Sequence, residues 1–148
     1  MDFDAFIKPI IDLPIAHAWR GQYSTIFLEL GKLRAGRTRR DGSVGNARGE
    51  FTVHLEPNWR IEGQRSIICG SNDSARALDK ALARLIDDRI VAISTVGSLP
   101  ELEITAKTLS LRTFAASKGQ PNWTVNRWSA PLAMYCRLGK IAFDGEHT

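Results

Sequence analysis

The sequence predicts an α+β fold that is mostly β: a curled or two-layered antiparallel sheet of about eight to nine strands, with one long amphipathic helix packed on it. Most of the chain alternates apolar and polar residues in short runs that end at turn residues. Only one segment, about 73–88, repeats apolar residues at helical spacing. Because the short runs leave no room for long crossovers, we expect the strands to pair antiparallel.

Length and composition fit a single domain, 1–148. The chain has 148 residues, of which 43% are hydrophobic and 24% are charged, as in an ordinary globular protein. No run approaches the ~18 to 20 consecutive apolar residues of a membrane span. Asp2 and Asp4 stand where a signal peptide would carry basic residues. We therefore expect a cytoplasmic protein that makes no membrane contact.

The first half of the chain predicts a docking segment followed by strands. Residues 2–12 can form a helix of about two turns that begins at Asp2 and is limited by Pro9. The runs 25–30 and 50–56 alternate apolar and polar residues, so each should place one face on a core and the other in solvent. Two further strands are expected after a short turn, over 59–62 and 65–70.

One segment has the pattern of an amphipathic helix. Between about 73 and 88, apolar residues recur three and four positions apart, which lays one stripe against a core. The stripe consists of Leu78, Ala81, Leu82, Leu85 and Ile86. Ser71 or Asn72 is the expected N-cap, because a side-chain oxygen there can accept a hydrogen bond from the first turn.

The remainder of the chain predicts more strands than one helix can cover. Gly139-Lys140 should form a two-residue hairpin turn that takes glycine first. The sheet must therefore curl, divide in two or be covered by a second chain, and we expect a homodimer. The predicted strands are 90–96, 102–105, 109–114, 123–128, 133–138 and 141–143.

Residues 35–49 predict a flexible basic loop, because they hold four glycines and almost nothing to bury. The stretch from 32 to 48 has six basic residues against one acidic residue, so the chain's net charge of +4 originates there. Clustered arginines can neutralise phosphates in a sequence-independent way, and a solvated loop is the alternative. The candidate nucleic-acid contacts are Arg34, Arg37, Arg39 and Arg40.

The sequence contains no recognisable catalytic motif, and no catalytic residue, metal site or cofactor is predicted. Of the three histidines, His17 is expected to be structural and His147 is next to the C-terminus. Cys69 and Cys136 each lie in an apolar run, so buried thiols are expected rather than a disulfide or a zinc site.

A polar group on one sheet face is the main candidate for chemistry. If 25–30 pairs with 50–56, Glu29 shares a face with His54 and Glu56, with Arg60 and Glu62 nearby. Carboxylates beside a histidine can perform acid–base work, and cross-strand charge pairs on a solvated face are the alternative. The candidate ligand-binding residues are Glu29, His54, Trp59, Arg60 and Trp123.

Four tryptophans exceed the usual number for a domain of this size. Trp59 and Trp123 begin predicted strands, which is typical of core anchors, although a tryptophan can also line a pocket or a dimer seam. Trp19 and Trp128 are the other two.

Four short motifs resemble those of a family of small bacterial proteins of unknown function. They are Trp59-Arg60-Ile61-Glu62, the run 65–71, Leu99-Pro100-Glu101-Leu102 and the run 119–124. The resemblance spans roughly Tyr23 to Phe143, and the loop 35–49 is longer than the family pattern. Because the family has no assigned reaction, the resemblance implies no catalytic residue.

Three functions follow from these observations as alternatives. The first is a non-enzymatic binding protein, regulatory or immunity-like, that meets a protein partner through a sheet face or dimer groove. The second is a weak nucleic-acid binder that uses Arg34 to Arg40. The third is an enzyme or small-ligand protein with a pocket near Trp59 and Trp123. Small size and the lack of a catalytic set favour the first.

Overall fold

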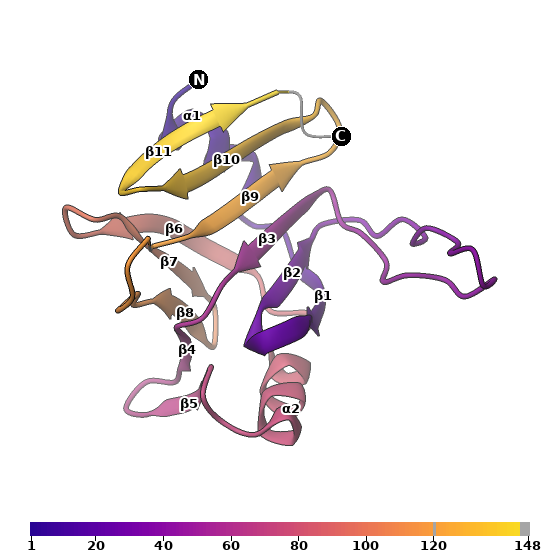
Figure 1. Ribbon diagram of the computed structural model, residues 1–148, viewed down its shortest axis with the longest axis horizontal. Coiled ribbons are helices and arrows are strands. Elements are labelled where there is room, and N and C mark those ends of the chain that lie inside the picture. Colours follow the sequence, from indigo (N-terminus) through magenta and orange to yellow (C-terminus); the bar gives the residue numbers. More distant parts are fainter. Residues whose placement is uncertain (120, 146–148) are drawn as a thin grey trace.

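The chain folds into two antiparallel sheets over a common core, as the computed structural model of residues 1–119 and 121–145 shows (Figure 1). The six-stranded sheet has the order β1-β2-β3-β9-β10-β11 and the five-stranded sheet the order β5-β4-β8-β7-β6. The first sheet consists of β1 Ile15–Arg20, β2 Ile26–Leu30, β3 Phe51–Leu55, β9 Trp123–Arg127, β10 Leu132–Arg137 and β11 Lys140–Asp144. The second consists of β4 Trp59–Glu62, β5 Ile67–Gly70, β6 Ile90–Val96, β7 Glu101–Ala106 and β8 Ser110–Thr113.

The predicted class, α+β and mostly β with antiparallel pairing, is confirmed. The strand count is higher than predicted, since the described residues form eleven strands. The additional strands include β1, whose residues 15–20 show apolar and polar side chains without the clear alternation of β3. Its pairing with β2 is interrupted by a register shift between Ile15 and His17, which explains why a simple period-2 pattern is missing.

The two sheets cover each other's apolar faces. Val53 and Val125 from the six-stranded sheet and Ile61 and Leu111 from the five-stranded sheet belong to one buried cluster. β3 leads directly into β4, so a single chain passes from one layer to the other. The division into two sheets therefore buries the apolar faces for which the sequence analysis considered a second chain as one possible cover. The homodimer stays a prediction.

The helical prediction is wrong in its extent. The helix predicted over about 73–88 is a shorter helix, α2 Ala75–Leu85, and the second short helix, α1 Phe3–Ile7, lies in the predicted segment 2–12. The α2 N-cap is Ser74, whose side chain accepts a hydrogen bond from the Ala77 amide, and not Ser71 or Asn72. The helix ends before Ile86, which has extended backbone angles and is 37% exposed.

The end of α2 is set by the chain that follows it. Asp87 has a positive φ of 72°, which turns the backbone out of the helix. The Asp88 carboxylate then accepts hydrogen bonds from Thr108 and Leu109 in the β7–β8 turn. Burial acts to raise the pKa of Asp88, but these hydrogen bonds outweigh it and lower the pKa below its ordinary value. The tertiary contact therefore stops a helix that the periodicity alone would extend.

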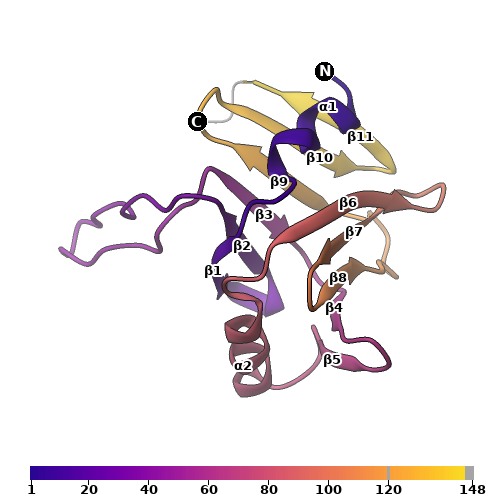
Figure 2. The same ribbon diagram turned by 180° about the vertical axis from the view of Figure 1, so that it is seen from behind.

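Helices cover the molecule at its two ends (Figure 2). The segment 2–12 forms α1 and a 3₁₀ turn, Lys8–Ile10, and Asp2 caps α1 by accepting a 2.8 Å hydrogen bond from the Ala5 amide. Phe6 of α1 is buried against Phe51 and Phe143. α2 lies against β1 and β5 through its apolar stripe. Among the described residues, no helix is long and apolar enough to cross a membrane.

One predicted turn is shifted by a residue. Arg137 pairs with Lys140, so the two-residue loop of the β10–β11 hairpin is Leu138-Gly139 and not Gly139-Lys140. Both loop residues have positive φ, 52° and 76°. This is the conformation of a hairpin turn that needs left-handed geometry at both positions, and it places glycine second.

Candidate functional site

A two-stranded projection, which we call the arm, extends from the body between β2 and β3 (Figure 1). It comprises residues 31–49. Arg34 and Arg48 exchange backbone hydrogen bonds of 2.8 and 3.0 Å, and the Gly45 amide donates to the Arg37 carbonyl at 2.8 Å. Nearer the tip, the Arg39 amide donates to the Ser43 carbonyl at 2.7 Å. Within the segment that the sequence predicts as a flexible basic loop, the backbone therefore forms hairpin hydrogen bonds.

Glycine has a structural role in the arm. Gly42 lies at the tip with a φ of 87°, which side chains rarely allow. A Cβ on Gly36 would stand 2.1 Å from the Gly45 carbonyl oxygen, so only glycine permits the two strands to approach this closely. The glycines that suggest flexibility in the sequence are therefore needed to form a tight hairpin.

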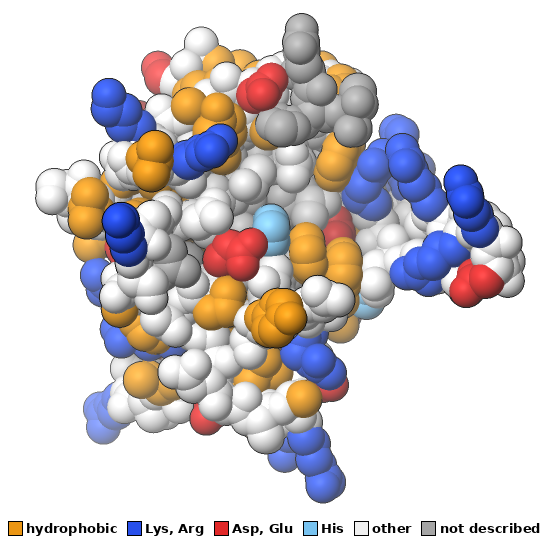
Figure 3. Space-filling model, viewed as in Figure 1, with side chains coloured by type: hydrophobic (Ala, Val, Ile, Leu, Met, Phe, Trp, Pro, Cys, Tyr) orange, Lys and Arg blue, Asp and Glu red, His pale blue; other side chains and the backbone are white. Residues whose placement is uncertain are grey.

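The arm carries basic side chains that have no acidic partner among the described residues. Figure 3 shows these side chains along its length. Its one carboxylate, Asp41, accepts hydrogen bonds from the Ser43 hydroxyl at 2.6 Å and the Ser43 amide at 2.9 Å. These hydrogen bonds hold the pKa of Asp41 below its ordinary value. The basic residues are Lys32, Arg34, Arg37, Arg39, Arg40 and Arg48.

A buried carboxylate attaches the arm to the sheet. Glu29 on β2 is only 2% exposed. Its oxygens accept hydrogen bonds from Trp19 Nε1 at 2.9 Å, from the Gly49 amide at 3.2 Å and from the Thr52 hydroxyl. Gly49 is the last arm residue, and Thr52 lies on β3, so one carboxylate ties the arm to two neighbouring strands. Buried carboxylates need such donors, because desolvation without them is costly.

A chain of contacts leads from Thr52 through Trp128 to Arg48 of the arm. Trp128 Nε1 donates to the Thr52 hydroxyl oxygen at 2.9 Å. The guanidinium of Arg48 lies 4.1 Å from the centre of the Trp128 ring, which is a cation–π distance. His17 Nε2 adds a 3.1 Å hydrogen bond to Asn46 Oδ1 of the arm. The base of the arm is therefore fixed at several points.

An aromatic stack crosses the same outer face of the six-stranded sheet. The rings of Trp19 and Phe27 are stacked at 4.0 Å, and those of Phe27 and His54 at 4.7 Å. The predicted pairing of 25–30 with 50–56 is present, with Phe27 opposite His54 and Glu29 opposite Thr52. Glu29 and His54 do share a face, but the Glu29 oxygens are occupied by the arm and by Trp19 and Thr52.

His54 is suited to packing rather than to proton transfer. Burial lowers its pKa below the ordinary value of 6.5, and the charge of Glu56 opposes that shift only partly. His54 Nε2 lies 3.4 Å from Glu56 Oε1. The neutral imidazole therefore dominates at pH 7, stacked on Phe27.

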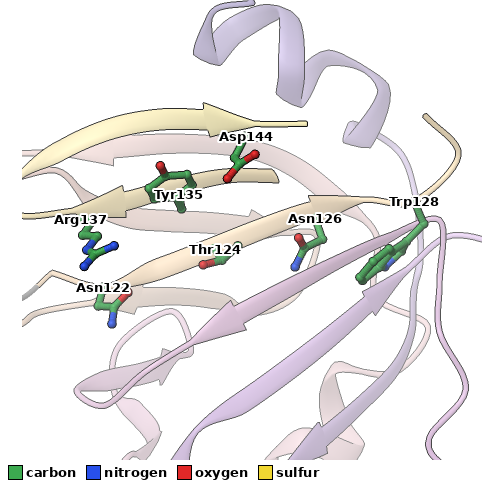
Figure 4. A pocket seen from close by; sticks show the side chains of 7 residues that line it. All are labelled: Asn122, Thr124, Asn126, Trp128, Tyr135, Arg137 and Asp144. Atoms are coloured by element: carbon green, nitrogen blue, oxygen red, sulfur yellow. The ribbon is translucent and has the colours of Figure 1, made fainter. Parts of the chain in front are cut away.

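An open cavity of about 500 Å³ lies on the outer face of the six-stranded sheet (Figure 4). Asn126 lies along β9 between Thr124 and Trp128, while Arg137 and Asn122 lie together at the end away from Trp128. Thr124 is the cross-strand partner of Tyr135. We call this hollow the sheet cavity; its lining is Asn122, Thr124, Asn126, Trp128, Tyr135, Arg137 and Asp144.

The remaining candidate residues lie elsewhere. Arg60 and Glu62 are on β4 of the five-stranded sheet and pair with each other at 2.5 Å, so they belong to a different sheet from Glu29 and His54. Trp59 and Trp123 are fully buried core residues. Their Nε1 atoms donate to the backbone carbonyls of Ser24 and Pro100, and neither lines the sheet cavity. The prediction that these tryptophans are core anchors fits the structure, because both side chains point from their strands into the core.

The cysteines are buried and form no disulfide. Burial, with a smaller contribution from Asp73, raises the pKa of Cys69 to about 11, and burial also raises the pKa of Cys136. Within residues 1–119 and 121–145, no group of three potential metal ligands is found. His147 and Gln120 lie outside the described residues.

Sequence reasoning missed the roles of Thr52 and Trp128, which connect the arm to the sheet cavity. It also missed four further lining residues: Asn126, Tyr135, Arg137 and Asp144. The alternation in 123–128 contains part of the signal, since it sets Thr124, Asn126 and Trp128 opposite to the buried Trp123 and Val125. What it could not supply is the pairing of β3 with β9, two strands far apart in the chain. No family model, no curated protein and no solved structure matches this chain.

Proposed function

We propose that this protein is a non-enzymatic binding module that holds the phosphate backbone of a nucleic acid with its arm. The observation that supports this most is the set of exposed arginines on a projecting hairpin, with no acidic partner among the described residues. Arginine guanidinium groups match phosphate oxygens in geometry and charge. Without a carboxylate partner, the arm's guanidinium groups keep their charge available for such an anion, although Arg39 also donates hydrogen bonds to the Ser43 hydroxyl and the Val44 carbonyl.

The form of the arm supports a backbone contact. A two-stranded ribbon is narrow, and its side chains project to both faces, so it can follow a groove or a single strand. Arg37 and Arg39 lie on one strand of the hairpin, with Arg40 at its tip. Contacts of this kind carry little sequence information, so affinity should be independent of sequence and sensitive to salt.

Fluorescence anisotropy with a labelled oligonucleotide tests the proposal. The variant Arg37→Ser/Arg39→Ser/Arg40→Ser should weaken binding about tenfold or more in low salt, because three phosphate contacts are lost. The matched control is Arg76→Ser/Lys80→Ser/Arg84→Ser, which removes three exposed positive charges from α2. Equal effects of the two variants would attribute binding to net charge alone and contradict a role for the arm.

A second candidate function, recognition of a protein partner, is favoured by one exposed aromatic residue. Tyr23 is 90% exposed and has a φ of 54°, followed by Ser24 with a φ of 62°. The loop is held in place, because Trp59 Nε1 donates a 2.7 Å hydrogen bond to the Ser24 carbonyl. Strained backbone that presents a tyrosine is typical of functional sites, and tyrosine is enriched at interface hot spots.

A photo-crosslinking amino acid at position 23 tests the second candidate in an extract of the source cells. A protein partner should be captured through that position, and the arm variant should capture it equally well. The same crosslinker at position 99, an exposed leucine on a different hairpin, is the control. Identical captures from the two positions would contradict recognition through Tyr23.

The homodimer, the cytoplasmic location and the resemblance to small bacterial proteins of unknown function also stay predictions. Light scattering at several protein concentrations tests the homodimer, and a monomer at every concentration would contradict it.

A further inference from the structure

We propose that the sheet cavity binds one unpaired nucleotide of a single-stranded nucleic acid whose neighbouring phosphates are held by the arm. This inference rests on the proposed function, and it names the form of nucleic acid that the protein prefers. Three features of the outer sheet face lead to it: the chemistry of the cavity lining, its cationic ends and its connection to the arm.

The cavity has the size and polarity of a site for a small polar ligand. Its volume of about 500 Å³ falls inside the range of roughly 300–1,000 Å³ typical of ligand pockets. Its lining comes from neighbouring strands, because Thr124 on β9 is the cross-strand partner of Tyr135 on β10 and Asp144 lies on β11. The cavity therefore lies over three adjacent strands and is lined mainly by polar side chains.

The lining presents groups that recognise a nucleobase. Asn122 and Asn126 each offer an amide donor and an amide acceptor, the combination that pairs with base edges. Tyr135 and the part of Trp128 that lines the cavity, away from Arg48, supply aromatic surface, and stacking on aromatic side chains is the main way in which proteins hold unpaired bases.

Cations stand at both ends of this cavity. Arg137 lies at the end away from Trp128 (Figure 4), and it is exposed. At the other end, the Arg48 guanidinium lies 4.1 Å from the Trp128 ring centre. A neutral ligand such as a saccharide gains no ionic attraction from two flanking guanidinium groups, whereas a nucleotide within a strand has a phosphate on each side.

The arm and the cavity are continuous through one pair of residues. Arg48 belongs to the arm's ladder, where its backbone pairs with Arg34, and its side chain covers Trp128 of the cavity. Trp128 is held in place by its hydrogen bond to Thr52, which in turn donates to Glu29. A strand that runs along the arm is thereby led to the cavity. In a duplex, paired and stacked bases would not be available to it.

Two measurements on the full chain test the inference. In the first, amide chemical shifts are followed by NMR as adenosine monophosphate or uridine monophosphate is added. We expect concentration-dependent shifts concentrated in β9 and β10, and weaker shifts with the uncharged nucleoside. Shifts confined to the arm, or equal shifts with glucose, would overturn the proposal.

The second measurement compares a single strand with a duplex of the same length by fluorescence anisotropy. The variant Asn126→Ala/Arg137→Ser should weaken single-strand binding about tenfold and leave duplex binding unchanged, because only an unpaired base enters the cavity. Lys107→Ser, on the β7–β8 turn, is the control for loss of an exposed positive charge. Equal losses for the strand and the duplex, or no loss, would overturn the cavity's role.

The two proposals fail in different ways. If the triple arginine variant of the arm binds oligonucleotides as well as the wild type, the proposed function fails. The NMR titration with a mononucleotide remains a separate test of whether the sheet cavity binds a nucleotide. If polyglutamate of matched charge competes with the oligonucleotide as effectively as an unlabelled oligonucleotide does, the arm recognises acidic chains in general, such as an acidic protein, and the nucleotide assignment is overturned.

Discussion

The arm and the β6–β7 hairpin are both two-stranded projections, but they are held by different forces. β6 and β7 pair from Ile90 with Ala106 to Val96 with Glu101, and Ile104 is buried in the core. The arm has two isolated bridges, and its larger apolar side chains, Leu33 and Val44, are exposed. Burial of apolar surface stabilises the first hairpin, whereas backbone hydrogen bonds and contacts at its base hold the second.

This difference separates residues that stabilise the fold from residues that are available to a partner. A basic hairpin that buries no large apolar side chain contributes little hydrophobic stabilisation. Its attachment to the sheet through Glu29 nevertheless fixes its direction. The arm therefore has the properties of a fixed recognition element. Substitutions in the β6–β7 hairpin should mainly reduce stability, whereas substitutions in the arm should mainly reduce binding.

The largest stability effect is expected from the β6–β7 hairpin. Ile104→Ala should reduce the free energy of unfolding by about 2–5 kcal/mol, because a fully buried side chain leaves a cavity. Val44→Ala in the arm, where the side chain is 61% exposed, should change it by less than about 0.5 kcal/mol. Urea denaturation measures both. Similar losses for the two variants would mean that the arm belongs to the cooperative core.

The second effect concerns the attachment of the arm. Glu29→Ala should cost about 1–3 kcal/mol, because buried donors from Trp19, Gly49 and Thr52 lose their acceptor. Glu62→Ala, which removes a partly exposed ion pair, should cost less than about 1 kcal/mol. Hydrogen exchange adds a local readout, since the Gly49 amide should exchange faster in Glu29→Ala. Unchanged Gly49 exchange would contradict the anchoring role.

A smaller effect is expected from His54. Its pKa is lowered in the folded protein by burial, so the unfolded chain binds the proton more readily. The stability that neutral His54 contributes is fully present above the ordinary pKa of 6.5 and is lost as the pH falls through the lower folded pKa. His54→Phe keeps a ring for the stack and should flatten this part of the stability profile, measured by denaturation between pH 7.5 and 5. If the pH dependence of the free energy of unfolding is the same in His54→Phe as in the wild type, a group other than His54 causes it.

The smallest effect on global stability is expected from Gly36→Val. The new side chain would collide with the Gly45 carbonyl and open the ladder, but the core would be untouched. The free energy of unfolding should stay within about 0.5 kcal/mol of the wild type. The Gly45 amide, which donates to the Arg37 carbonyl, should lose its protection from hydrogen exchange. Retained protection would show that the arm tolerates a side chain at this position.

The strands were the most predictable part of the fold, because alternation marks a face directly. Phe51, Val53 and Leu55 are buried as their spacing indicates, and β6 has the predicted bounds of 90–96. The end of α2 was not predictable, because the hydrogen bonds of Asp88 to residues 108 and 109 are made by a distant turn. Local periodicity cannot contain such a contact.

The candidate site was predictable only in pieces. The arginines of the arm stand out in the sequence by their number. The hairpin that carries them was hidden, since glycines that allow close approach look the same as glycines that allow flexibility. The link between the arm and the sheet cavity depends on β3 lying beside β9, which no local pattern determines. Trp128 therefore became informative only once its hydrogen bond to Thr52 was known.

The most direct test of the arm's role is the salt dependence of oligonucleotide binding. For single strands, the slope of log K against log salt is about −0.7 for each phosphate contact. Removing Arg37, Arg39 and Arg40 should therefore make the slope less steep by about 2 units. The α2 control variant should keep the wild-type slope. A triple arm variant with the wild-type slope, or an α2 variant that loses as much, would contradict the account.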